Sequence, residues 1–182
     1  MMSTIKSKIL ALVAVLAIAA SAAIAAPARS PQDDARTANK VRKELVTLPY
    51  YGVFDNLAYK VEGNTVTLYG QVVDAITRKD AENRVKRIAG VERVINNIEV
   101  LPVGGFDNTI RVRTYRAIAR TGGLYRYFMG ANPSIHIVVN RGRVTLEGVV
   151  SNRMDSQLAY TAARQVPGVF QVTNNLRVEN ER

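Results

Sequence analysis

The sequence predicts an α+β fold made of two tandem domains, each with the element order helix, strand, strand, helix, strand. Three observations support this prediction. The chain contains an internal repeat, several short segments alternate apolar and polar residues as half-buried strands do, and other segments place apolar residues on one face of a helix. Together they indicate two copies of one small αββαβ unit.

Nearly the same sequence occurs twice in this chain. Residues 66–100 align with residues 144–178 at a constant offset of 78, and 12 of these 35 pairs are identical. Both copies open on Val-Thr-Leu-x-Gly-x-Val and end on Gly-Val followed by Asn-Asn. The period is too long and the copies are too few for a solenoid. Small domains bury a limited core, so we expect the two copies to pack on each other.

The first copy is expected to start with a helix capped by Asp33 or Asp34 and stopped by Pro49. A β-hairpin follows, with Gly63-Asn64 at its turn, where positive φ angles are needed. Asp74 is expected to cap a second helix, and a last strand completes the unit.

The second copy repeats this order. Asp107 or Asn108 is expected to cap a helix that runs to about Arg120. A hairpin turns at Asn140-Arg141-Gly142, and Asn152 is expected to cap the next helix. The expected organisation of the chain is a signal peptide at 1–25, a loose leader at 26–33, domain 1 at 34–101, a linker at 102–105, domain 2 at 106–178 and a tail at 179–182.

Glycines recur at matching places in the two copies. Gly70 and Gly148 lie inside strands, where glycine lowers stability unless a bulge or a close backbone requires it. We expect a helix to cross the sheet at these two points. Gly90 and Gly168 are placed to end the second helix of each copy in a left-handed cap. All four glycines are therefore interpreted as structural residues.

The N-terminal segment has the order of a secretory signal. Lys6 and Lys8 precede an uninterrupted apolar run of 12 residues at 9–20, which is too short to span a bilayer. Ala23-Ile24-Ala25 then suits cleavage after Ala25. We therefore expect the mature chain to be soluble in the periplasm, with a retained N-terminal anchor as the alternative. The chain has no cysteine, so we expect no lipid anchor and no disulfide.

Positive charge is concentrated in the second half of the chain. The full chain has a net charge of +10. Residues 26–104 account for +2 and residues 105–182 for +6, and all 11 basic residues of the second half are arginine. Such asymmetry concerns partners rather than fold. In an exported protein the abundant polyanions are phospholipid headgroups, lipopolysaccharide and teichoic acids, and we expect anionic phospholipid to be the partner. Nucleic acid is then out of reach, and it stays an alternative only if the N-terminal segment is not an export signal.

Catalytic and metal-binding patterns are missing from the sequence. His136 is the only histidine, and its place on a predicted strand, out of phase with the apolar residues, suggests an exposed side chain. No nucleophile–base set can be assembled around it, and neither a phosphate-binding loop nor a dinucleotide fingerprint is present. We therefore expect no enzyme activity, no cofactor and no metal site.

The repeated pattern resembles the BON domain family. Its hallmarks are Val66–Val72 with Gly90-Val91 and Asn96-Asn97, and again Val144–Val150 with Gly168-Val169 and Asn174-Asn175. The resemblance covers essentially the whole expected mature chain and implies, in each domain, a small mixed sheet with two helices on one face. It also implies a periplasmic protein linked to osmotic stress and outer-membrane integrity, because the family includes such dual-domain proteins. Some members bind anionic phospholipid and others attach to larger membrane channels.

One stretch of the second half combines arginines with aromatic residues. Arg113, Arg116 and Arg120 fall at i, i+3 and i+7 on the helix face opposite the apolar stripe. Arginine pairs with phosphate through two hydrogen bonds, and aromatic rings settle at headgroup depth. The candidate lipid-binding residues are Arg113, Arg116, Arg120, Tyr125, Arg126, Tyr127 and Phe128. The alternative is a solvated helix face, with the aromatic residues packed between the two domains.

The sequence thus favours a non-catalytic, periplasmic envelope-maintenance or stress protein that binds anionic phospholipid, chiefly through domain 2. The alternative is a protein-interaction or holdase-like module that contacts envelope proteins through sheet edges or through Tyr50, Tyr51 and Phe54. The oligomeric state is left open by the sequence.

Overall fold

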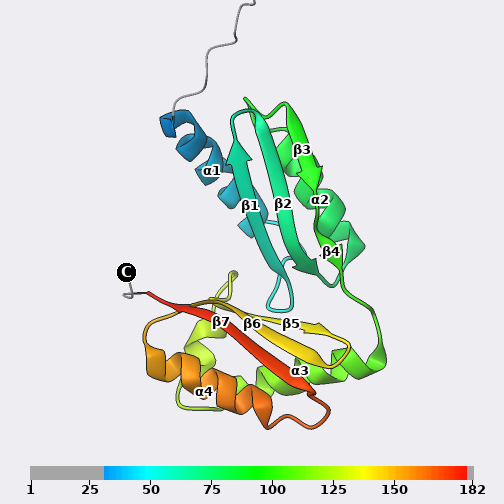
Figure 1. Ribbon diagram of the computed structural model, residues 1–182, viewed down its shortest axis with the longest axis vertical. Helices are drawn as coiled ribbons and strands as arrows, with labels where there is room; N and C mark the ends of the chain where they lie inside the picture. The colour runs from blue at the N-terminus through cyan, green and yellow to red at the C-terminus, as the bar shows by residue number, and fades with distance from the viewer. Residues whose placement is uncertain (1–30, 180–182) are drawn as a thin grey trace, which may run out of the picture.

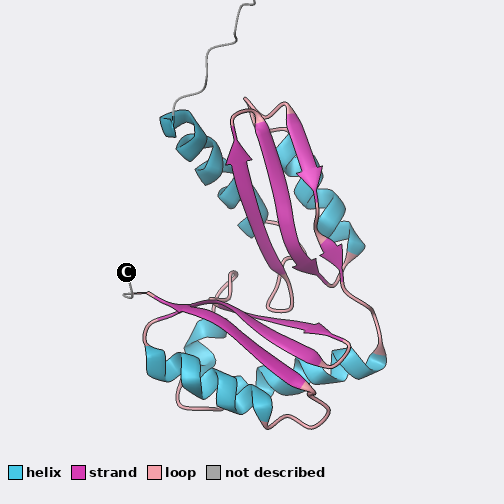
Figure 2. Ribbon diagram, viewed as in Figure 1, coloured by secondary structure: helices cyan, strands magenta, loops and turns pink. Residues whose placement is uncertain are grey.

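The computed structural model describes residues 31–179 and contains two αββαβ units in tandem (Figures 1 and 2). The first contains α1 (Pro31–Val46), β1 (Asn56–Glu62), β2 (Thr65–Val72), α2 (Ala75–Lys86), β3 (Arg93–Asn96) and β4 (Glu99–Val100). The second contains α3 (Gly105–Ala119), the 3-10 helix η1 (Leu124–Phe128), β5 (Ile135–Asn140), β6 (Arg143–Val150), α4 (Arg153–Arg164) and β7 (Gln171–Val178). The α+β prediction is confirmed, and the predicted signal peptide lies outside the described residues.

Each unit has a mixed sheet. β1 runs antiparallel to β2, which pairs in parallel with β3 and β4, and β5, β6 and β7 repeat this arrangement. Figure 2 shows both helices of each unit on the same side of their sheet. The predicted last strand of the first unit is divided into β3 and β4, and between them the N–H of Asn97 donates to the Leu68 carbonyl (2.9 Å).

The apolar periodicity of the sequence explains the two cores. In the first unit, Val41 and Leu45 of α1 pack with Val66 and Leu68 of β2. In the second, the core is formed by side chains of α3, η1, α4 and the three strands, among them Ile110, Ile118, Leu124, Ile137, Leu146 and Ala163.

The repeated Asn-Asn has a structural explanation. The side-chain amide of Asn96 donates to the Arg78 carbonyl (3.1 Å), and its Oδ1 accepts from the N–H of Ile98 (3.1 Å). Asn174 does the same with the carbonyl of Ser156 (3.3 Å) and the N–H of Leu176 (3.3 Å). Each asparagine therefore joins its strand to the second helix of its unit.

Two of the expected helix caps are present and two are not. Asp74 accepts from Ile76 N (2.8 Å), and Asn152 accepts from Asp155 N (2.9 Å). α1 already begins at Pro31, ahead of Asp33 and Asp34, so the helix includes part of the expected leader. α3 begins at Gly105 after Gly104, which offers no side-chain cap, so Asp107 and Asn108 lie inside the helix.

Asp107 serves the neighbouring hairpin turn instead. Its two carboxylate oxygens accept from the N–H groups of Arg141 and Gly142, each at 2.8 Å. Arg141 has a φ of +51°, which costs a residue with a Cβ about 1 kcal/mol or more. The Asp107 carboxylate offsets this cost by fixing the turn.

The strand glycines meet a neighbouring strand rather than a helix. Gly70 and Gly148 have φ angles of +111° and +121°. A Cβ at either position would lie 2.0 Å from a backbone oxygen at the start of the paired strand, that of Asn56 or Ser134. The expectation that a helix crosses the sheet at these two points was therefore wrong. Another backbone does approach each glycine closely, but it belongs to the neighbouring strand.

Gly90 and Gly168 also have positive φ angles, of +94° and +92°. They lie in the turns closed by Val91 N to Ile88 O (3.0 Å) and by Val169 N to Val166 O (3.2 Å). α2 and α4 end earlier, at Lys86 and Arg164, so these glycines form the turn that follows each helix rather than its cap.

The second sheet is covered on both faces along β5. Helices α3 and α4 cover one face, and the end of the first unit lies against β5 from the other side (Figure 1). Val53, in the loop between α1 and β1, accepts from the N–H of Ile137 (2.7 Å), and Asn140 donates to Glu99 (3.2 Å). The expected packing of one unit on the other is thus observed.

His136 lies in this contact. It is only 9% exposed, so the expectation of an exposed strand residue was wrong. The predicted alternation along the strand is confirmed, because Ile135 and Ile137 face the helices and His136 faces the opposite side of the sheet. The first unit covers that side, and no pattern within one repeat could reveal this contact.

No helix within residues 31–179 is both long and apolar enough to cross a membrane.

Candidate functional site

α3 is held against β5 by buried residues on its inner side. Ile110, Thr114 and Ile118 are buried, and Arg111 donates from Nη2 to the carbonyl of Val139 (3.0 Å). Burial lowers the pKa of Arg111, and the carboxylate of Asp107 partly counteracts this effect. Arg111 is therefore a structural residue, and the opposite side of α3 faces solvent.

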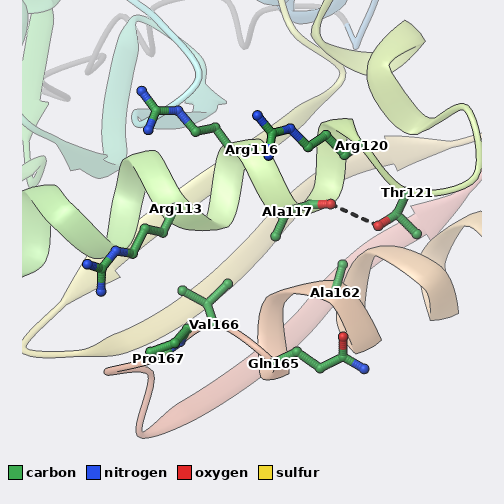
Figure 3. A pocket seen from close by; sticks show the side chains of 9 residues that line it. All are labelled: Arg113, Arg116, Ala117, Arg120, Thr121, Ala162, Gln165, Val166 and Pro167. Carbon is green, nitrogen blue, oxygen red and sulfur yellow. Dashed lines mark hydrogen bonds between the residues drawn. The ribbon is translucent and has the colours of Figure 1, made fainter.

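The three predicted helix arginines lie on that exposed side. Arg113, Arg116 and Arg120 are all exposed and line one side of an open groove of about 450 Å³ between α3 and α4 (Figure 3). Arg116 and Arg120 extend in the same direction in this view, whereas Arg113 extends the other way, toward the side where Pro167 lies. We call Arg113, Arg116 and Arg120 the arginine face.

The rest of the groove is apolar or uncharged. Ala117 and Thr121 continue it on the α3 side, and Ala162, Gln165, Val166 and Pro167 form the α4 side. The contribution of α4 could not be recognised from the sequence, because these small and apolar residues carry no chemical signature. The groove has no acidic lining residue, so its electrostatic potential is positive.

The first unit has a groove in the corresponding place but with different charges. Lys40, Glu44, Arg84 and Arg87 line it. Arg84 forms an ion pair with Glu44 (3.5 Å) and donates to Thr47 (3.3 Å). One carboxylate therefore neutralises part of this groove, in contrast to the arginine face.

The predicted aromatic segment is divided by the fold. Tyr125 is 58% exposed, whereas Tyr127 is only 7% exposed and belongs to the second core. Phe128 is partly buried and meets Tyr115 edge to face, with ring centroids 4.9 Å apart. Tyr127 and Phe128 therefore pack within their own unit. They do not extend outward as a lipid-facing site requires, and they do not pack between the two units as the alternative required.

Arg126 is engaged by an acid of its own unit. Its Nη2 lies 2.5 Å from Oδ2 of Asp155, and the same carboxylate oxygen accepts from the Tyr127 hydroxyl (2.5 Å). The Tyr127 hydroxyl accepts in turn from the N–H of Ser151 (2.9 Å). Arg126 thus belongs to a structural network, and the other arginines among the predicted lipid-binding residues are those of the arginine face.

The geometry of the arginine face suits binding to anions. Residues 31–179 contain no cluster of three or more acidic or histidine side chains that could hold a metal ion. An exposed helix face with several guanidinium groups can contact several phosphates at once, each through two hydrogen bonds. The charge and the hydrogen-bond donors of the arginine face are therefore complementary to those of a polyanion.

The comparisons with known proteins find one family and a set of distant structures. The BON domain model matches residues 33–102 and again residues 106–180. The structure resembles a solved chain of CdsD, a structural protein of the type III secretion system of Chlamydia trachomatis, with 10% identity and a TM-score of 0.30 over 80% of this chain and 94% of that chain. It also resembles the C-terminal domain of CdsD, with 12% identity and a TM-score of 0.27 over 77% of this chain and 96% of that domain. These scores are too low for either structure to bear on function, and no curated protein matches the chain.

Proposed function

The chain belongs to the BON domain family, and on this basis we propose that it is a non-catalytic protein of the bacterial envelope that binds anionic phospholipid surfaces through its second domain. Family members associate with membranes and phospholipid, which makes a lipid surface the first partner to consider. The secretory pattern of residues 1–25 supports a periplasmic location, where such surfaces are the abundant polyanions. A role in envelope maintenance or stress follows from the same family relationship.

The observation that carries the proposal is the arginine face. Its three arginines line a groove that has no acidic lining residue, whereas the groove of the first unit contains Glu44. Each base near an anionic leaflet contributes about 1 kcal/mol of binding free energy. Three such contributions, about 3 kcal/mol together, favour an attachment that is weak, reversible and salt-sensitive.

Charge reversal tests this proposal directly. The chain from Ala26 to Arg182 is sedimented with vesicles of phosphatidylglycerol and phosphatidylcholine across a salt series. Binding is expected to rise with phosphatidylglycerol content and to fall with salt, because exposed charges are screened. Replacing Arg113, Arg116 and Arg120 by Glu should abolish it.

A matched control separates this face from net charge alone. Arg78, Lys79 and Arg87 are exposed bases on or next to α2, and replacing them by Glu changes the net charge by the same amount. This control should retain most of the binding. Equal losses in both variants, or unchanged binding after reversal of the arginine face, would contradict the assignment.

The alternative, a module that contacts envelope proteins, retains one supporting observation. Among the described residues, β7 pairs only with β6, so one edge of an eight-residue strand can accept another strand. The loop that holds Tyr51 and Phe54 is used within the chain and supports this alternative less than expected. Absence of vesicle binding at low salt would favour the protein-contact function.

A further inference from the structure

Two phenylalanines form an exposed pair at the end of the second unit that meets the linker. Phe106 lies in the first turn of α3, and Phe170 lies immediately before β7. Their side chains are 54% and 76% exposed, yet their ring centroids lie only 6.0 Å apart. We call these residues the aromatic pair.

A hairpin turn holds the aromatic pair in place. Phe170 donates from its N–H to the carbonyl of Gly142 (2.9 Å). A Cβ at Gly142 would lie 2.5 Å from Cδ2 of Phe170 and 3.2 Å from Cε1 of Phe106. The rings therefore pack over the bare backbone of this glycine, which leaves their outer faces to solvent.

The first unit shows that the fold does not require these aromatic residues. The repeat offset of 78 places Glu92 opposite Phe170 and Asn64 opposite Gly142. The same backbone bond is present there, from Glu92 N to Asn64 O (2.9 Å). The side-chain amide of Asn64, however, donates to the carboxylate of Glu92 (2.5 Å). The turn and the strand start therefore meet in the same way with polar side chains in the first unit. Folding alone does not explain why the second unit exposes apolar rings at this place.

The aromatic pair is continuous with the arginine face. Phe106 precedes Arg113 by seven residues on α3, which is close to two helical turns, so both lie on the same side. Pro167 lines the groove, and the following Gly168 approaches Phe106, where a Cβ would lie 3.5 Å from the ring. The same surface therefore carries cations along its length and apolar rings at one end.

We propose that the aromatic pair inserts into the headgroup–acyl boundary of an anionic leaflet while the arginine face binds the phosphates above it. This inference rests on the proposed function and adds the insertion point. Aromatic side chains favour this depth of the bilayer, and basic residues beside them match the charge of the leaflet. Attachment then has an apolar part that salt does not screen.

A tryptophan probe tests insertion, because the chain contains no tryptophan. Phe170→Trp is mixed with vesicles of equal phosphatidylglycerol and phosphatidylcholine whose acyl chains are brominated near the glycerol backbone. Its fluorescence is expected to shift to the blue and to be quenched. Glu92→Trp places the probe at the equivalent junction of the first unit and should show neither change.

The outcomes separate this inference from the proposed function. Sedimentation of Phe170→Trp with the vesicles but no quenching would overturn insertion and leave phospholipid binding intact. A failure of both variants and of the unmodified chain to sediment at low salt would overturn the proposed function and insertion together. A blue shift without vesicles that grows with protein concentration would assign the aromatic pair to self-association and overturn insertion.

A second variant removes the rings without changing charge. Phe106→Ser with Phe170→Ser should weaken vesicle binding roughly tenfold at a salt concentration that still permits binding. The slope of affinity against salt should stay unchanged, because the arginine face is intact. Unchanged affinity would overturn the inference, and circular dichroism of the variant checks that these exposed substitutions leave the fold intact.

Discussion

Tyr51 of the first unit stacks on His136 of the second, with ring centroids 5.3 Å apart and ring planes inclined by 33°. His136 Nδ1 lies 3.2 Å from the carbonyl oxygen of Gly52, and Nε2 lies 3.4 Å from the Tyr51 hydroxyl. A carbonyl only accepts, so Nδ1 carries the proton and Nε2 accepts from Tyr51. The neutral imidazole therefore fits both partners in this contact between the units.

We predict that acid weakens this contact. Burial lowers the pKa of His136 below its ordinary value of 6.5, although the carbonyl of Gly52 and the carboxylates of Asp55 and Glu147 oppose the shift. The unfolded chain then binds more protons than the folded chain when the pH falls below about 6.5. The stabilisation is present at higher pH and is lost as the pH falls from that value toward the lower folded pKa. The NMR titration of the only histidine should give a pKa below 6.5.

His136→Gln provides the control for this prediction. Other groups at the contact also titrate: burial raises the pKa of Asp55 above 3.8, and that of Tyr51 to about 12. Asp55 acts with the opposite sign, over a pH range that extends upward from 3.8, because its folded form holds a proton more tightly. The difference between the free energies of unfolding of the original chain and of His136→Gln isolates the histidine. A difference that does not change between about pH 8 and pH 5 would contradict the prediction.

Gly148→Ala is predicted to disrupt the second unit. A Cβ there would lie 2.0 Å from the backbone oxygen of Ser134, at a φ of +121° that alanine rarely adopts. We expect a loss of at least about 3 kcal/mol in the free energy of unfolding, measured with urea. Gly104→Ala is the control, because nothing lies within 4 Å of a Cβ there and its φ is −109°. Equal stability of the two variants would contradict the observed strand pairing.

The fold could be predicted because its signals are local and repeated. Alternation along the strands, helical spacing and capping residues such as Asp74 and Asn152 act within a few neighbours, and the repeat shows each of them twice. The errors arose where a distant partner competes with a local role. Asp107 has the sequence position of a cap, but its carboxylate instead binds the turn at Arg141, which lies 34 residues further along the chain.

The candidate site could be predicted only in part, for the same reason. Helical spacing placed Arg113, Arg116 and Arg120 on the exposed side of α3, where the structure has them. The positions of Arg126 and Tyr127 could not be predicted in this way. Both side chains contact Asp155 on α4, and such a contact depends on how η1 packs rather than on the local sequence. The α4 wall of the groove required the tertiary structure as well.

Tyr127→Phe should destabilise the chain without affecting its exposed surface. The hydroxyl donates to the buried carboxylate of Asp155 and accepts from the N–H of Ser151, so its loss leaves both groups without this partner. We expect the free energy of unfolding to fall by about 1–3 kcal/mol in urea titrations. Tyr125→Phe, at an exposed position, should change it by less than about 0.5 kcal/mol. An equally small effect at Tyr127 would show that the hydroxyl network does not stabilise the fold.

Arg126 and Arg116 should differ in their contributions to vesicle binding. Arg126 is compensated by Asp155, whereas Arg116 lines a groove without an acid. Arg116→Gln should therefore weaken binding to phosphatidylglycerol vesicles about fivefold, the equivalent of about 1 kcal/mol for one base at an anionic leaflet. Arg126→Gln should change vesicle affinity by less than about twofold, while it lowers the free energy of unfolding through loss of the ion pair. If Arg126→Gln weakened binding as strongly as Arg116→Gln, the lipid-facing surface would have to extend from the arginine face onto η1.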